Sequence, residues 1–210
     1  MSQYFEMHPC NPQKRLVLQA VAILQNGGVA AFPTDASYSL GCHLGDKRAL
    51  DQLRRIRRLS DKHHLTLMCQ DLSEIATYAK ITNSDYRLLK SLTPGPYTFL
   101  LSATHEVPRR VLQAKKRTIG IRVVDHPVMR AILDELGQPL LSTTLHLEDD
   151  EYPLIDGYDI RERLENQLEL VIDTGENCTI ETTTVIDLTG DQPYVVRQGL
   201  GVDHGLPVQE

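Results

Sequence analysis

The sequence predicts one α/β domain: a twisted sheet of mixed parallel and antiparallel strands with flanking helices. Short apolar runs typical of buried strands alternate with segments of helical periodicity through most of the 210 residues, of which 41% are hydrophobic. The last three strand candidates have no helix-length segment between them, which favours hairpins and therefore antiparallel pairs. We expect a single domain over residues 1–210, with its core at about 12–200 and a short tail at each end.

The first helix is expected to begin near Asn11, which can act as the N-cap, with Pro12 at the first helical position. Apolar residues then recur at helical spacing up to Gly27 and Gly28, which end the helix. A short buried strand at 29–32 leads into a polar segment at 32–41, F-P-T-D-A-S-Y-S-L-G. These residue types are poor core material and typical of a shaped loop at a strand end.

A basic helix is predicted at 47–59, because Leu50, Leu53, Ile56 and Leu59 form an apolar stripe between arginines. The alternation of elements then continues. Strands are expected at 38–42, 65–69, 97–102, 118–124 and 139–144. Helices are expected at 71–78, 83–92 and 125–136, with Asp71, Asn83 and Asp125 as their N-caps. The helix at 125–136 ends at Gly137. An acidic segment at 148–169 holds one surface helix, and the final strands are 168–173, 182–188 and 194–197.

Positive charge is concentrated in two parts of an acidic chain whose net charge is −6. The windows 46–64 and 105–122 hold 13 of the 22 basic residues and four of the 28 acidic ones, so they carry +9 and the remainder carries −15. Such segregation allows a domain to bind phosphates while it stays acidic overall. Two solvated helix faces would give the same pattern.

Polar side chains follow several predicted strands, where open α/β sheets bind ligands. They form five clusters: Thr34, Asp35, Ser37 and Tyr38; Arg55, Arg57 and Lys62; Thr98; Arg122; and Ser142, Thr143 and Thr144. If Arg122 is buried, it needs a counter-anion from a protein carboxylate or a ligand; otherwise it reaches solvent at a sheet edge. Arg55 and Arg57 diverge on a helix but converge on extended chain, where the pair could clamp a phosphate. Arg197 is a further candidate cation.

Several classes of site are not indicated. The four cysteines show no spacing typical of a zinc site or a disulfide framework, and the eight histidines show no metal-binding motif, so we predict no protein-bound metal. No P-loop, GxGxxG or GxSxG motif is found. We expect a soluble protein without membrane contact, because no signal core or membrane-length apolar run occurs. The cysteine spacing suggests no secreted disulfide framework, so we expect a cytoplasmic location.

Seven motifs, taken together in their order and spacing, resemble the YrdC/YciO family, most closely its YciO branch. They are FPTDASYSLG, RIRRL followed by HLTLMCQDLSE, LTPGPYTFLL, TIGIRVVDHP, LLSTTLH, TTTVIDLTG and VVRQG. The resemblance covers nearly the whole chain and implies a basic concave cavity that binds nucleotide, with double-stranded RNA or tRNA as a partner. It also implies threonylcarbamoyl-AMP synthesis from L-threonine, bicarbonate and ATP with Mg²⁺, a step in tRNA modification that releases pyrophosphate.

The resemblance assigns roles to individual residues. Residues expected at a threonine-like substrate are Thr34, Tyr38, Thr98 and Arg122. Residues expected at the nucleotide are Arg55, Arg57, Lys62, Ser142, Thr144, Thr183 and Arg197. Arg55, Arg57 and Arg122 would supply the catalytic charges. Residues of the basic windows expected at RNA are Arg54, Arg58, Arg109, Arg110, Lys115, Lys116 and Arg117.

The sequence departs from the family pattern around the nucleotide. Arg55 stands where the family has lysine, His146 where it has asparagine and Ser39 where it has glycine, and two residues are inserted between Arg57 and residue 65. A guanidinium does not copy the point charge of a lysine. Three hypotheses therefore remain open: a synthase, a non-catalytic RNA-binding protein, and a related adenylyl or carbamoyl transferase acting on another substrate.

Overall fold

The computed structural model describes residues 2–60, 63–112 and 117–208. In this part of the chain, ten strands form one sheet in the order β1-β8-β2-β3-β7-β4-β6-β5-β9-β10. The strands are β1 Gln3–Glu6, β2 Ala30–Phe32, β3 Ser39–His43, β4 Thr66–Met68, β5 Tyr97–Ser102, β6 Thr118–Arg122, β7 Leu140–Thr144, β8 Leu170–Asp173, β9 Thr184–Asp187 and β10 Tyr194–Arg197. The helices are α1 Lys14–Gln25, α2 Lys47–Arg57, α3 Leu72–Tyr78, α4 Asn83–Leu92, α5 Pro127–Leu136 and α6 Gly157–Leu164, with a short 3₁₀ helix at Arg109–Val111.

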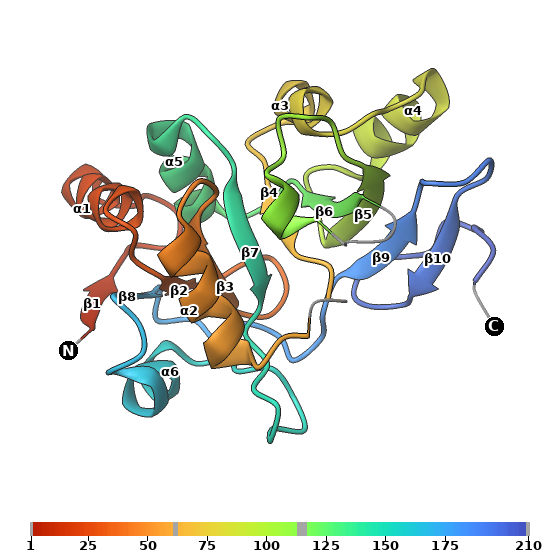
Figure 1. Cartoon of the computed structure of the whole chain (residues 1–210). Helices are drawn as coiled ribbons and strands as arrows, with labels where there is room; N and C mark the ends of the chain where they lie inside the picture. The colour runs from red at the N-terminus through yellow and green to blue at the C-terminus, as the bar shows by residue number, and fades with distance from the viewer. Residues whose placement is uncertain (1, 61–62, 113–116, 209–210) are drawn as a thin grey trace.

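The predicted mixed sheet is confirmed. Strand β8 pairs in parallel with β1 and β2, β4 with β6, and β5 with β9, and the other five pairs are antiparallel. Of the last three strands only β9 and β10 form a hairpin, so the prediction that all three do is wrong. The reason is that β8 pairs at the β1 end of the sheet and β9 at the far end (Figure 1).

The helices cover the two faces of the sheet unequally. Four helices, α2, α3, α4 and α6, bury their apolar stripes in one large core cluster on one face. On the other face, α1 and α5 lie side by side over the strands at the β1 end of the sheet (Figure 1). They enclose a smaller core there. No helix of the described residues covers the rest of that second face, and this is what creates room for a site.

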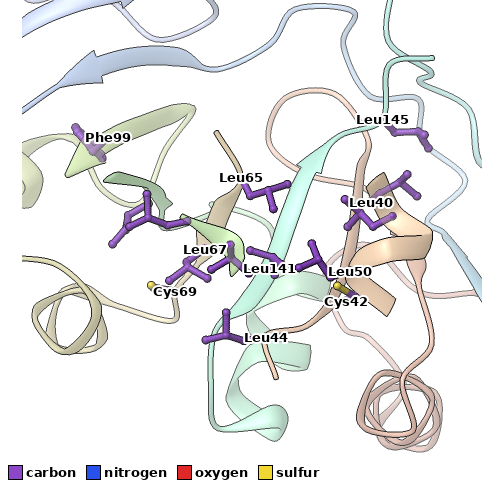
Figure 2. Packing of buried hydrophobic residues seen from close by; sticks show 14 of the residues in the cluster. Leu40, Cys42, Leu44, Leu50, Leu65, Leu67, Cys69, Phe99, Leu141 and Leu145 are labelled. Atoms are coloured by element: carbon purple, nitrogen blue, oxygen red, sulfur yellow. The ribbon is translucent and has the colours of Figure 1, made fainter. Parts of the chain in front are cut away.

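The large core is built by the period-two alternation of the strands. Leu40, Leu141 and Leu67 come from the neighbouring strands β3, β7 and β4 and belong to the same cluster as Leu50 of α2 and Cys42 (Figure 2). All of these side chains are at most 1% exposed. Burial of each leucine stabilises the fold by about 1.5–3 kcal/mol.

Some predicted boundaries need correction. Gln13, not Asn11, precedes α1, and its side chain makes no cap hydrogen bond. Thr82 caps α4 in a reciprocal capping box with Asp85, one residue before the predicted Asn83. Strand β1 lies in the segment that we expected to be an N-terminal tail. It was missed because a four-residue edge strand carries little periodicity.

Helix α2 sets the position of the basic residues. Asp46 caps its first turn by accepting a hydrogen bond from the backbone N–H of Ala49 at 2.9 Å. The helix continues through Arg57 and ends only at Arg58, which adopts a left-handed conformation with φ 47°. Arg55 and Arg57 therefore both lie on the helix and point in different directions.

Candidate functional site

A polar cavity of about 400 Å³ opens on the uncovered part of the sheet. Its floor consists of side chains at alternate positions of β4, β5 and β7, among them Thr66, Thr98 and Thr144. The full lining comprises Arg57, His63, His64, Thr66, Thr98, Leu100, Thr143, Thr144, His146, Thr182, Thr183, Val185, Val196 and Arg197. The alternation that buries leucine on one face thus presents threonine on the other.

The cavity favours anions. Its lining, as far as the chain is described, holds two arginines and three histidines but no aspartate or glutamate. Nε of Arg57 is buried and finds no acceptor in the described part of the chain. Burial lowers the pKa of Arg57, since desolvation disfavours the charged form, although a guanidinium still keeps its proton. A buried donor without an acceptor costs free energy, so this side chain is suited to receive a ligand oxygen.

Hydroxyl and imidazole groups form short contacts around the cavity. The hydroxyls of Thr98 and Thr183 lie 2.8 Å apart. Nε2 of His63 lies 3.2 Å from Oγ1 of Thr143. Arg197 stands at the rim, where its Nη2 donates to the backbone carbonyl of Thr183 at 2.9 Å. These contacts fix the polar groups in place before any ligand arrives.

Arg122 forms a second, deeper cluster at the end of β6. The side chain is 5% exposed and its Nη2 pairs with the carboxylate of Asp35. The same nitrogen lies 3.4 Å from Oγ1 of Thr34. Of the alternatives for the counter-anion, the protein carboxylate is therefore the one found. Nε of Arg122 is nevertheless buried without an acceptor among the described residues.

The loop at 33–38 is held in shape by its own side chains. Oγ1 of Thr34 accepts a hydrogen bond from the backbone N–H of Ala36 at 3.0 Å and donates to the carbonyl of Ser37 at 2.7 Å. Asp35 also accepts from the backbone N–H of Asp125 at 3.1 Å, which ties the loop to the segment before α5. The loop thus brings Asp35 and Thr34 to Arg122 with little freedom of movement.

The Arg122 cluster adjoins the cavity. In the antiparallel pair of β5 and β6, Leu100 faces Gly120. Thr98 lies two residues before Leu100 on β5 and Arg122 two residues after Gly120 on β6, so both side chains are on the same side of the sheet as the cavity. A Cβ atom on Gly120 would lie 2.7 Å from Oγ1 of Thr66 and 3.3 Å from Cγ2 of Thr98, so a glycine here leaves the cavity floor open.

The structure brings most of the predicted site residues together, but not all of them. Arg57, Thr144, Thr183 and Arg197 line the cavity with Thr98, and Thr34 meets Arg122 behind it. Lys62 lies outside the described residues.

Three predicted site residues are placed elsewhere. Arg55 is exposed on another side of α2, beside Glu148 and Asp149, because two residues in a helix turn by about 200°. Tyr38 is fully buried in the large core, where its hydroxyl donates to the carbonyl of Ile172 at 3.2 Å. Ser142 is 1% exposed, its hydroxyl donates to the carbonyl of Thr66 at 3.1 Å, and it is not among the residues that line the cavity.

The two basic windows meet in space. Nη2 of Arg54 on α2 donates to the carbonyl of Arg110 at 3.0 Å, and Arg109 is exposed beside it. Arg58 is a poor candidate for RNA, because it pairs with Glu148 at 3.1 Å and Asp149 at 3.4 Å. Arg117 is exposed before β6, in a surface hollow with Lys80 and His105. Lys115 and Lys116 lie outside the described residues.

Sequence reasoning missed the three histidines of the cavity. It noted only that the histidines show no metal-binding motif and that His146 departs from the family pattern. The spacing of these histidines along the strands would have revealed them. His64 lies two residues before Thr66, so its side chain continues the polar side of β4. His146 likewise follows Thr144 of β7 at a spacing of two.

Other features of the described residues do not suggest a site. A hollow of about 470 Å³ near the start of α2 is lined by three carboxylates, and one of them, Glu169, accepts from the backbone N–H of Val29 at 2.7 Å. Within the described ranges, no group of three or more His, Cys, Asp or Glu side chains is arranged to hold a metal ion. No helix in those ranges is long and apolar enough to cross a membrane.

Comparison with known proteins shows the family of the chain and supports its fold. Residues 22–199 match the family model for the Sua5, YciO and YrdC domains, described as telomere recombination. The chain is 52% identical over 201 residues to the uncharacterized protein YciO of Escherichia coli strain K12, covering 96% of this chain and 97% of that protein. The crystal structure of E. coli YciO superimposes with a TM-score of 0.91, at 51% identity and with 96% and 98% of the two chains covered.

A more distant solved structure has the same fold. The crystal structure of P. abyssi Sua5 complexed with L-threonine matches with a TM-score of 0.87 at 22% identity. The match covers 94% of this chain and 58% of Sua5. At this identity the likeness extends to the fold alone.

Proposed function

Because the chain belongs to the Sua5/YciO/YrdC family, we propose that it is a threonylcarbamoyl-AMP synthase-like enzyme. The reaction joins L-threonine and bicarbonate to the AMP part of ATP and releases pyrophosphate and water. ATP would bring Mg²⁺ with it as part of the substrate. A related adenylyl or carbamoyl transfer on another small acid would use the same cavity.

The observation that carries this proposal is the cavity with cationic groups and no described carboxylate in its lining. Two arginines converge there, and Nε of Arg57 is buried without an acceptor. Triphosphate oxygens would supply that acceptor, and a guanidinium binds phosphate well because of its planar set of donors. Hydroxyls of Thr98 and Thr183 add donors for the sugar or the phosphates.

The Arg122 cluster is the proposed binding place for the amino-acid carboxylate. Asp35 occupies one end of the guanidinium, whereas the buried Nε still lacks an acceptor. The P. abyssi relative was solved with L-threonine, which supports an amino acid as ligand in this family. Thr34 and Thr98 would then lie beside the bound acid.

The chemistry fits residues of this kind. The carbamate formed from threonine and bicarbonate attacks the α-phosphorus of ATP through an oxygen. The new P–O bond replaces the bond between the α-phosphorus and pyrophosphate. Both reactants, the carbamate and ATP, are anions that repel each other. Fixed cations that hold them in line reduce this repulsion, and positioning contributes further. No protein nucleophile is needed.

Pyrophosphate release from MgATP is expected to require both L-threonine and bicarbonate. Arg57→Ala should lower the rate by about a hundredfold, because it removes a cation at the reacting phosphates. Arg55→Ala is the matched control: it removes the same charge from the exposed side of the same helix and should leave the rate unchanged. A coupled pyrophosphate assay measures both. Release that does not depend on threonine, or no release from the wild type, would rule out the synthase.

Binding of duplex RNA is the second candidate function, and it is favoured by the hydrogen bond that joins the two basic windows at Arg54 and Arg110. Affinity for a duplex RNA should fall steeply with salt, since bound phosphates displace counterions. Reversing the charge of Arg109 and Arg110 should reduce the slope of log affinity against log salt by about one for each phosphate that the protein no longer neutralises. Fluorescence anisotropy measures this slope, and Arg130→Glu on α5 is the control. Binding that does not change with salt would argue against this function.

A further inference from the structure

His63 lies at the mouth of the cavity together with Arg57. Both residues line it, whereas Arg55, the other half of the predicted arginine pair, lies on a different side of α2. Nε2 of His63 is 3.2 Å from Oγ1 of Thr143, and solvent reaches the ring. The position that the predicted pair gave to Arg55 beside Arg57 is thus taken by an imidazole in this cavity, where Arg197 is the second guanidinium.

The titratable groups that face His63 all disfavour its protonation. Desolvation, followed by the charges of Arg57, His64 and Arg197, lowers the pKa of His63 to about 4. None of these facing groups is a carboxylate, within the part of the chain that the structure describes. His63 is therefore neutral near pH 7 while the cavity holds no ligand.

We infer that His63 is a phosphate-binding residue that takes up a proton from solvent when a di- or triphosphate enters the cavity. The inference deepens the proposed function and rests on the cavity as a polyphosphate site. Negative phosphate oxygens offset the field of Arg57 and Arg197 and attract the proton. The protonated ring then has a donor on each nitrogen, one toward Thr143 and one for a phosphate oxygen.

The pH dependence follows from the direction of this change. The free protein has a low pKa at His63 and the bound protein a higher one, so affinity rises as pH falls between the two values. The rise can reach about tenfold for each pH unit in that window. Phosphate oxygens of the ligand titrate as well. Comparison of two protein variants with one ligand at one pH removes that contribution.

The test is titration calorimetry with MgATP and, separately, inorganic tripolyphosphate, in pairs of buffers that differ in ionisation enthalpy. These pairs give the number of protons taken up on binding. At about pH 6 the wild type should take up more protons than His63→Gln, and the variant should bind about tenfold more weakly. At about pH 8.5 the two affinities should agree within about twofold. His105→Gln, which changes a histidine 89% exposed outside the cavity, should behave as the wild type does.

Glutamine keeps a hydrogen-bonding group but does not titrate, and the exposed position should tolerate it, so unfolding is not a confounding outcome. Equal proton uptake by the wild type and His63→Gln would overturn the inference. If tripolyphosphate binds with proton uptake that depends on His63 but MgATP does not bind, the inference holds and the nucleotide part of the proposed function fails. If neither ligand binds the wild type, both fail.

Discussion

Replacing Asp35 with alanine is expected to destabilise the protein by about 3–5 kcal/mol. The change leaves the guanidinium of Arg122, 5% exposed, without its counter-anion in a low-dielectric setting. It also removes the acceptor for the backbone N–H of Asp125, a hydrogen bond that joins the loop to the segment before α5. A loss of about 3–5 kcal/mol is a large part of the free energy of unfolding of a domain, which is about 5–15 kcal/mol in total. Urea denaturation followed by circular dichroism measures the decrease.

A control and a rescue separate this effect from removal of charge in general. Asp149→Ala removes a carboxylate that pairs with Arg58 at the surface and should leave the denaturation midpoint unchanged. Asp35→Leu combined with Arg122→Met should recover most of the stability, because apolar side chains replace the buried pair. The double variant should still be inactive, since the proposed partner of the substrate carboxylate is gone. An Asp35→Ala protein as stable as the wild type would show that the pair is not desolvated.

The elements that sequence predicted well are those with a local pattern. Strand β5 has the predicted bounds, and α2 begins where it was predicted, because an apolar run marks the strand and an apolar stripe marks the helix within a few residues. The choice of partner strands is not local. β8 and β9 follow one another in the chain, yet they lie in different parts of the sheet, a difference that no pattern within either strand encodes.

The site was predictable in composition but less so in geometry. Arg122 had to have a counter-anion if buried, and Asp35 supplies it. The orientation of Arg55 depended on where α2 ends, and sequence boundaries are uncertain by a turn or less, which is enough to reverse the direction of a side chain. Tyr38 shows the same sensitivity, because a shift of one residue in a strand moves a side chain from the cavity face to the core.

One wall of the cavity depends on a close approach of two backbone segments. Residues 182–184 and 197–201 lie against one another: the backbone N–H of Gly199 donates to Oγ1 of Thr184 at 2.9 Å, and that of Leu200 donates to the carbonyl of Thr182 at 2.9 Å. A Cβ atom on Gly199 would lie 2.2 Å from the carbonyl oxygen of Thr182 and 2.6 Å from the carbonyl carbon of Thr183. Both are backbone atoms, so no side-chain rotation can relieve the overlap.

Gly199→Ala is therefore expected to push these segments apart and to cost about 1–3 kcal/mol of stability. Arg197 would lose the carbonyl of Thr183 that now fixes its Nη2, so nucleotide affinity should fall at least about tenfold, as expected when one charge-assisted hydrogen bond is removed. Calorimetric titration with MgATP and thermal denaturation measure the two effects. Gly190→Ala in the turn between β9 and β10 is the matched control, because a Cβ atom there meets no atom of the described residues within 4 Å and both measurements should be unchanged. Normal affinity in Gly199→Ala would mean that this wall does not position Arg197 for the ligand.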